Sequence, residues 1–256
     1  MTVPVSTKWT LDAAGPAGRV AVESVYMVVC QRTGSKGSGW LHKSGQIVTN
    51  EHVIRGCGPL DVTLVSSLGV QHPVARLVVD SGHDLALLSP SSALAGGLEI
   101  DQSTDLEVGM AVHTWGFPLG YNGPAPLLSV GYLAGFIERP SASGPNKHLV
   151  VNGAFNPGNS GGPVFAAGSN RVRAVVVSKH APISQFHESA IEALAQNKSG
   201  VVFTGTDGAG NPVTFVESQI VADLIKYFRG LTQVMIGEAI SAETLTIFLS
   251  KNGVAA

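Results

Sequence analysis

Residues 153–165 read GAFNPGNSGGPVF and surround a single serine, Ser160, with backbone that carries few large side chains. The glycines Gly158, Gly161 and Gly162 all lie within two residues of this serine. Glycine adopts backbone conformations that other residues rarely adopt, and it lets another group come close to the main chain. The stretch is therefore either a plain polar turn or a loop whose backbone takes part in chemistry.

Two chemical interpretations compete with the plain turn. Residues 158–162 fit the G-x-S-x-G pattern of a nucleophile elbow, in which the serine must lead directly into a helix. Here Ser160 is followed by Gly-Gly-Pro and then by Val164 and Phe165, so the exit is a strand. We therefore prefer an oxyanion-hole loop, in which the backbone N–H groups of Gly158 and Ser160 stabilise a tetrahedral intermediate.

A base and an acid that suit this serine lie upstream. The run IVTNEHVI places His52 at the end of an apolar strand, and HDLALL places Asp84 at the head of another. The chain order His52, Asp84, Ser160 is the order of a chymotrypsin-type triad. We therefore predict that His52 is the general base, that Asp84 orients it, and that Ser160 is the nucleophile.

Asp80 is the alternative acid, because it lies four residues before Asp84. It precedes a Ser-Gly pair, which predicts a solvated turn position. The apolar run LALL directly after Asp84 predicts a place at the mouth of a buried core. We therefore favour Asp84.

No cofactor and no metal site is expected. His187 and Glu188 begin an H-E-x-x-H pattern, but Ile191 occupies the position of the second histidine. The other histidines are scattered singly, and we expect them at the surface or in satisfied structural positions.

The chain as a whole predicts an all-β fold. Short β-branched runs such as VYMVVC, DVTLVSS and RVRAVVVSKH alternate with turn residues, which is typical of antiparallel barrels. We predict two antiparallel β-barrels with C-terminal helices and a helical insertion. The expected parts are an N-terminal extension at 1–23, a first barrel at 24–105, a second barrel at 106–216 with the insertion near 184–211, and a helical tail at 217–256.

Within the tail, two segments carry helix signals. Ile220, Val221, Leu224, Ile225 and Phe228 fall on one helical face, and Gly230 is expected to end that helix. A further helix is expected after Ser241, which stands where an N-cap belongs.

Four motifs in the same order resemble the HtrA/Deg serine proteases of the trypsin-like class: GSGWLHKSGQIVTNEHVI, ARLVVDSGHDLALL, GFPLG and GAFNPGNSGGPVF. A fifth segment, NPVTFVESQIVADLI, is similar to the last barrel strand and the helix after it in that family. The resemblance implies the trypsin-type fold, a protease domain without a PDZ domain, and the triad and oxyanion hole named above. It implies a cofactor-free serine endopeptidase that acts on protein or peptide substrates.

By position, the resemblance also implies a primary substrate pocket lined by Ala154, Phe155, Val177, Ser178 and Lys179. No acidic residue is expected at the base of this pocket, so we predict cleavage after small or medium apolar residues. Lys179 could instead attract an acidic side chain. A catalytically silent or latent protease fold that acts as a binding or scaffold protein is the competing class, and an esterase is a weaker alternative.

Composition limits the partners and the location. The net charge is −2 and no block of Lys or Arg occurs, so neither nucleic acid nor an anionic membrane is expected as a partner. The oligomeric state cannot be predicted. The chain has neither a run of eighteen apolar residues nor a recognisable leader, which favours a cytoplasmic location. Cys30 and Cys57 could be bridged, but reduced thiols in small core positions are expected.

Overall fold

The computed structural model describes residues 3–103, 105–179, 185–206, 211–231 and 236–255, with the backbone alone at 178–179, 185–188 and 229–231. The chain divides into two units. Unit 1 comprises Met1–His180 and Val234–Ala256, and unit 2 comprises Ala181–Gln233. Each unit is described by itself.

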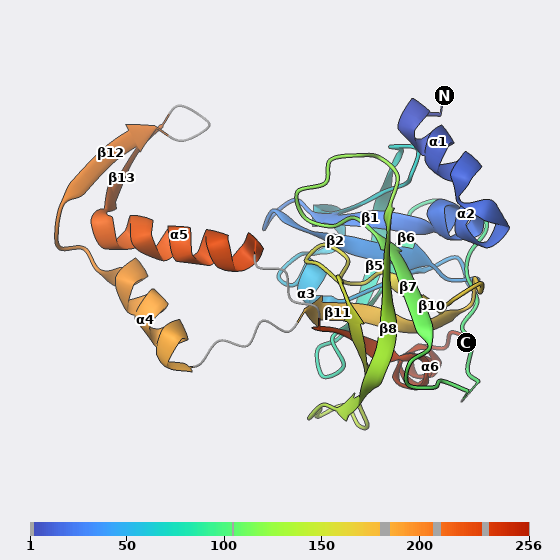
Figure 1. Cartoon of the computed structure of the whole chain (residues 1–256). Coiled ribbons are helices and arrows are strands. Elements are labelled where there is room, and N and C mark those ends of the chain that lie inside the picture. The colour runs from blue at the N-terminus through green and yellow to red at the C-terminus, as the bar shows by residue number, and fades with distance from the viewer. Residues whose placement is uncertain (1–2, 104, 180–184, 207–210, 232–235, 256) are drawn as a thin grey trace. The chain divides into compact units, whose positions relative to one another are not determined.

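The first barrel of unit 1 is a closed sheet in the order β1-β2-β3-β6-β5-β4 (Figure 1). Its strands are β1 (Val25–Cys30), β2 (Ser35–Leu41), β3 (Ile47–Thr49), β4 (Val62–Val65), β5 (Gln71–Asp80) and β6 (Leu85–Pro90). The short helices α3 (Glu51–Ile54) and η1 (Pro59–Asp61) follow β3. Apolar side chains such as Val28, Leu41, Leu64 and Leu88 fill this barrel and are fully buried.

The second barrel closes in the order β10-β11-β14-β9-β8-β7. Its strands are β7 (Ala111–Gly116), β8 (Leu127–Glu138), β9 (Lys147–Gly153), β10 (Pro163–Ala166), β11 (Val172–Lys179) and β14 (Ile236–Ser241). Every strand pair in both barrels is antiparallel. The predicted all-β fold of two antiparallel barrels with C-terminal helices is thereby confirmed.

Helices at both ends of the chain complete unit 1. They are α1 (Val5–Ala13), α2 (Gly15–Ser24) and α6 (Ala242–Lys251). The predicted N-terminal extension is therefore helical, and Ala21 and Val22 of α2 join a core cluster with Trp40 and Phe248. Helix α6 begins at the predicted cap, where the side chain of Ser241 accepts a hydrogen bond from Thr244 N.

The last strand of the second barrel differs from the prediction. The segment expected to supply it is β13 (Pro212–Val216), which pairs with β12 (Val202–Thr206) in a separate two-stranded sheet. The barrel is closed instead by β14, inside the segment predicted to be a helical tail. The buried Glu238 makes this strand look polar in sequence, but Arg139 neutralises it by an ion pair.

Unit 2 therefore extends beyond the insertion predicted near 184–211. It contains α4 (Gln185–Gln196), β12, β13 and α5 (Glu217–Leu231). Helix α5 continues past Gly230, which was expected to end it. In chain order, unit 2 thus falls between β11 and β14, which pair with each other in the second barrel.

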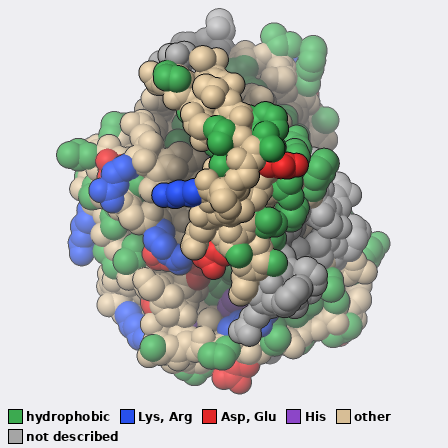
Figure 2. Space-filling view, turned by 90° about the vertical axis from the view of Figure 1, so that its left-hand side faces the viewer, with side chains coloured by type: hydrophobic (Ala, Val, Ile, Leu, Met, Phe, Trp, Pro, Cys, Tyr) green, Lys and Arg blue, Asp and Glu red, His purple; other side chains and the backbone are tan. Residues whose placement is uncertain are grey.

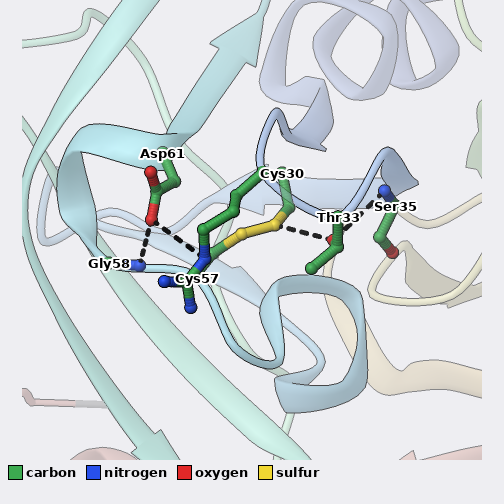
Figure 3. The surroundings of a disulfide bond; sticks show 7 residues. Cys30, Thr33, Ser35, Cys57, Gly58 and Asp61 are labelled. Atoms are coloured by element: carbon green, nitrogen blue, oxygen red, sulfur yellow. Dashed lines mark hydrogen bonds and ion pairs between the residues drawn. A yellow bond between two sulfur atoms is a disulfide. The ribbon is translucent and has the colours of Figure 1, made fainter.

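Cys30 and Cys57 form a disulfide, so the expectation of reduced thiols is wrong for this structure (Figure 3). Cys30 ends β1 and Cys57 follows α3, and their Cα atoms are 6.2 Å apart, within the normal range for a bridge. The two positions are 27 residues apart in sequence. Their proximity depends on how the barrel closes, which composition does not show.

The charged side chains do not form a block of one sign on the face shown in Figure 2, where Lys and Arg alternate with Asp and Glu. Within the described ranges, no helix has the length and apolar character that crossing a bilayer requires.

Candidate active site

The predicted base and acid form a tight pair. Nδ1 of His52, on α3, lies 2.7 Å from Oδ2 of Asp84, and the backbone N–H of His52 donates to Oδ1 of the same carboxylate at 2.9 Å. Two hydrogen bonds therefore fix both the position and the ring orientation of the imidazole. The bond to Nδ1 leaves Nε2 as the nitrogen that can accept a proton.

The backbone of Asp84 is held in an uncommon conformation. Its φ is +55°, and Asp84 is the sole non-glycine with a positive φ among the residues that the structure describes. Its carbonyl oxygen accepts hydrogen bonds from Asn50 Nδ2 at 2.9 Å and from Glu51 N at 3.3 Å. Such conformations persist only where surrounding contacts over-determine them. Here the contacts come from the segment that carries His52.

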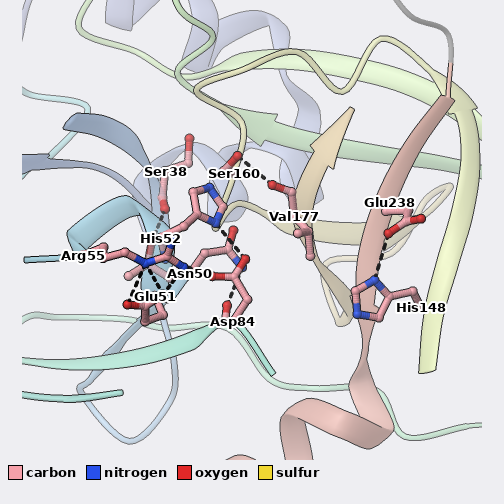
Figure 4. A network of polar contacts seen from close by, with 11 residues as sticks. Ser38, Asn50, Glu51, His52, Arg55, Asp84, His148, Ser160, Val177 and Glu238 are labelled. Carbon is pink, nitrogen blue, oxygen red and sulfur yellow. Dashed lines mark hydrogen bonds and ion pairs between the residues drawn. The ribbon is translucent and has the colours of Figure 1, made fainter. Parts of the chain in front are cut away.

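Ser160 lies in the loop between β9 and β10, and 9% of its surface is exposed. In the view of Figure 4, the imidazole of His52 lies between Asp84 and Ser160. The Ser160 hydroxyl donates to the carbonyl oxygen of Val177 on β11 at 2.8 Å. The hydrogen-bond acceptor of the Ser160 hydroxyl in this structure is therefore a main-chain oxygen of β11.

Two glycines of the loop around Ser160 are required by the backbone itself. Gly158 has φ +93°, and a Cβ there would lie 2.3 Å from the carbonyl oxygen of Phe117. Gly161 has φ +84°, and its Cβ would lie 2.1 Å from the carbonyl oxygen of Ser38. Both glycines are thus required by left-handed backbone and by close contact with neighbouring main chain, and not only by room for a substrate.

Two backbone N–H groups of this loop are available to bind an anion. Among the described residues, neither Gly158 N nor Ser160 N donates to another group. The carbonyl groups of both residues are held by Ser38: Gly158 O accepts a hydrogen bond from Ser38 Oγ at 2.7 Å, and Ser160 O accepts one from Ser38 N at 2.8 Å. Anchored, unpaired donors are what an oxyanion hole requires.

The predicted pocket residues are only partly brought together. Val177 is half-buried beside Ser160, and Ala154 is half-buried. Phe155 is fully buried in the core of the second barrel and exposes no surface to a substrate. A Cβ at Gly237 on β14 would lie 2.8 Å from Phe155 Cβ, so the Phe155 ring packs directly on that strand.

Ser178 and Lys179 were also predicted to line the pocket. Their backbones extend β11 opposite Glu238 and Gly237, and their side chains lie outside the described residues. Glu238 is turned away into a buried cluster with Arg139 and His148. Burial, together with the charge of Arg139, lowers the pKa of His148 despite the opposing effect of Glu238.

Three residues support the site in ways that the sequence does not show. Ser38 was hidden in a Gly-Ser-Gly run that is typical of a turn but lies in β2. Asn50 directly precedes the α3 segment in sequence, but its hydrogen bond to the Asp84 carbonyl oxygen joins residues far apart in the chain and has no sequence signal. Asp80 was expected to be solvated, but its side chain is 13% exposed and pairs with His83 at 2.8 Å.

The described residues contain no group of three or more His, Cys, Asp or Glu side chains that could hold a metal ion.

Comparison with known proteins places this geometry in context. Residues 37–175 match a family model described as a trypsin-like peptidase domain. A probable periplasmic serine endoprotease, DegP-like, of Hahella chejuensis is 33% identical over 141 residues, which cover 53% of this chain and 28% of the relative. The chloroplastic Protease Do-like 1 of Arabidopsis thaliana is 35% identical over 137 residues, covering 50% of this chain and 30% of the relative. The chain thus spans less than a third of these relatives.

Solved structures share the fold at low sequence identity. The Rv3671c protease from M. tuberculosis in its active form superposes with a TM-score of 0.62 at 16% identity, covering 96% of this chain and 88% of the other. An HtrA-type protease solved with a tripeptide gives a TM-score of 0.61 at 16% identity, covering 94% of this chain and 63% of the other.

Proposed function

Because this chain belongs to the family of trypsin-like peptidase domains, we propose that it is a serine endopeptidase with a His52, Asp84, Ser160 triad. The observation that carries the proposal is the pair of hydrogen bonds from His52 to the Asp84 carboxylate. The HtrA and DegP names of its relatives support a protein or peptide as the substrate.

Hydrolysis would proceed through an acyl-enzyme. The Ser160 hydroxyl rotates away from Val177 O, passes its proton to His52 Nε2 and attacks the scissile carbonyl carbon. The oxyanion that forms accepts hydrogen bonds from Gly158 N and Ser160 N. The imidazolium, stabilised by Asp84, then protonates the leaving amine, and a water molecule that His52 deprotonates releases the acid product.

We propose a preference for small or medium apolar P1 residues. The resemblance at Ala154 and Val177 supports it, because both side chains are small or medium, apolar and half-buried. No free acid faces the predicted pocket from β14, since Glu238 is held by Arg139 and His148. A P1 Lys or Arg would therefore lack a counter-charge.

Profiling of a peptide library with the wild type and Ser160→Ala tests the proposal. We expect cleavage after residues such as Ala and Val, lost in the serine variant. A profile dominated by P1 Lys or Arg would overturn the specificity. Hydrolysis of ester substrates without any peptide cleavage would point to the esterase alternative.

A latent or silent protease fold is the second candidate, and the bond from Ser160 Oγ to Val177 O favours it. A latent enzyme holds its serine on β11 until a signal or a substrate releases it. Folded wild type that cleaves nothing in the library would support this candidate.

A cytoplasmic location was expected, but the Cys30–Cys57 disulfide favours an oxidising compartment, because cytosolic thiols are kept reduced. Thiol labelling of protein taken directly from its source cells would distinguish the two.

A further inference from the structure

The turn that carries the catalytic acid is organised by a second aspartate. Asp80 ends β5, and its Oδ1 accepts hydrogen bonds from the backbone N–H groups of Gly82 at 3.0 Å and His83 at 3.2 Å. Its Oδ2 lies 2.8 Å from Nδ1 of His83, whose ring is fully buried. One carboxylate therefore binds the two residues that immediately precede Asp84.

The same carboxylate connects the two barrels. The hydroxyl of Ser143, in the loop between β8 and β9, donates to Asp80 Oδ1 at 2.6 Å. The carbonyl oxygen of Ser143 in turn accepts from Lys251 Nζ at 3.0 Å, at the end of α6. Gly82 packs against Ser143 so closely that a Cβ there would lie 2.2 Å from Ser143 Oγ.

The charge of the Asp80 carboxylate strengthens its contacts with Ser143 and His83. Partial burial raises the pKa of Asp80, but the hydrogen bonds from Ser143 and His83 outweigh it, and the pKa lies below its usual value. The carboxylate is thus ionised near neutral pH and accepts charge-assisted hydrogen bonds, which are stronger than neutral ones. His83 and Lys251 are the titratable groups that face this cluster.

We propose that Asp80 is a positioning residue for the catalytic acid. Together with Ser143 it holds the turn that keeps Asp84 in its left-handed conformation, and so aligns the Asp84 carboxylate with His52. Asp84 does not bond to Asp80 and depends on it through the backbone of 82–83. The inference rests on the proposed peptidase function and adds a link from the second barrel to the acid of the triad.

The test replaces Asp80 with Ala and with Asn in the full chain. Asp80→Ala removes both carboxylate oxygens that hold Gly82, His83 and Ser143. We expect kcat to fall about tenfold with KM changed less than about twofold. A loosened Asp84 stabilises the imidazolium less, so the acidic limb of the pH–kcat profile should move to lower pH by about half a unit. Asp80→Asn keeps an acceptor for the same N–H groups and should recover most of the activity.

Ser143→Ala gives a second, milder test that keeps the charge of Asp80. It should lower kcat in the same direction by about threefold, because one strong hydrogen bond is lost. If Asp80→Ala does not fold, this variant carries the test alone.

Asp61→Ala is the matched control. The Asp61 carboxylate also accepts a backbone N–H in a turn of the first barrel, from Gly58 at 2.8 Å, but it leads to no triad residue. It should lower stability without moving the pH profile. If the Asp80 and Ser143 variants lose stability but keep the pH profile of wild type, as this control does, then Asp80 is merely structural and the proposal is wrong.

A measurement that needs no substrate separates this proposal from the proposed function. In isotope-labelled protein, the proton that His52 Nδ1 shares with Asp84 gives a downfield NMR signal. Asp80→Ala should shift or broaden this signal, whereas Asp61→Ala should leave it unchanged. Wild type without peptidase activity would refute the proposed function alone, and an unmoved signal in Asp80→Ala would refute the positioning role.

Discussion

Gly158→Ala tests whether the backbone of the serine loop is part of the catalyst. At φ +93° a non-glycine residue costs about 1–2 kcal/mol. The added Cβ would also lie 2.3 Å from Phe117 O and 2.6 Å from Leu119 N, which are backbone atoms that cannot rotate away. The loop must therefore shift, and with it the Gly158 N–H donor. Loss of one such donor costs about 2.7–4 kcal/mol, so kcat should fall by about 10²–10³.

Gly168→Ala is the matched control, because Gly168 has φ +76° but nothing within 4 Å of the added Cβ. It should carry the conformational cost alone, seen as a fall in Tm of about 2–8 °C with kcat unchanged. The assay is steady-state hydrolysis of the best library peptide, alongside thermal unfolding of each variant. If Gly158→Ala folds and keeps kcat within about twofold of wild type, the loop does not supply the oxyanion hole as argued.

Asp84→Asn should lower kcat by about 10⁴ at neutral pH, measured with the same peptide, because the amide no longer holds His52 in the required tautomer. Burial, with the charge of the adjacent lysine, lowers the pKa of His42 to about 4. The imidazole of His42 binds a proton near pH 6.5 in the unfolded chain but only near pH 4 in the folded one. The free energy of unfolding should therefore fall by up to about 3 kcal/mol between pH 6.5 and pH 4. Denaturant unfolding of His42→Gln should show a smaller loss over the same range. Reduction of the Cys30–Cys57 bridge, which closes a 27-residue separation, should cost about 3.5 kcal/mol of stability. An equal Tm with and without reductant would contradict that last estimate.

The motifs and their chain order were enough to predict the fold and the pairing of His52 with Asp84. His52, Asp84 and Ser160 each stand at the end of an apolar run or in a loop, and the fold pairs the first two directly. The alternation of β-branched runs and turns identified most strands, because the side chains on one face of each strand are buried in a barrel interior and must be apolar.

The strand that closes the second barrel and the role of Asp80 depend on contacts between residues far apart in sequence, which a local sequence pattern does not show. PVTFV has the stronger strand pattern, yet it pairs with VFTGT nearby. The weaker IGEAIS closes the barrel, and its buried Glu238 forms an ion pair with Arg139 and a hydrogen bond with His148. Asp80 looked solvated because Ser143, 63 residues away in sequence, could not be foreseen as its partner.

The most direct test of the central claim is labelling with a fluorophosphonate probe, which reacts with a serine only when a neighbouring base activates it. We expect intact mass and peptide mapping to place one adduct on Ser160 of wild type, and Ser160→Ala and His52→Ala to remain unlabelled. Folded wild type that stays unlabelled, or an adduct that persists in His52→Ala at the wild-type rate, would contradict the claim that His52 activates Ser160.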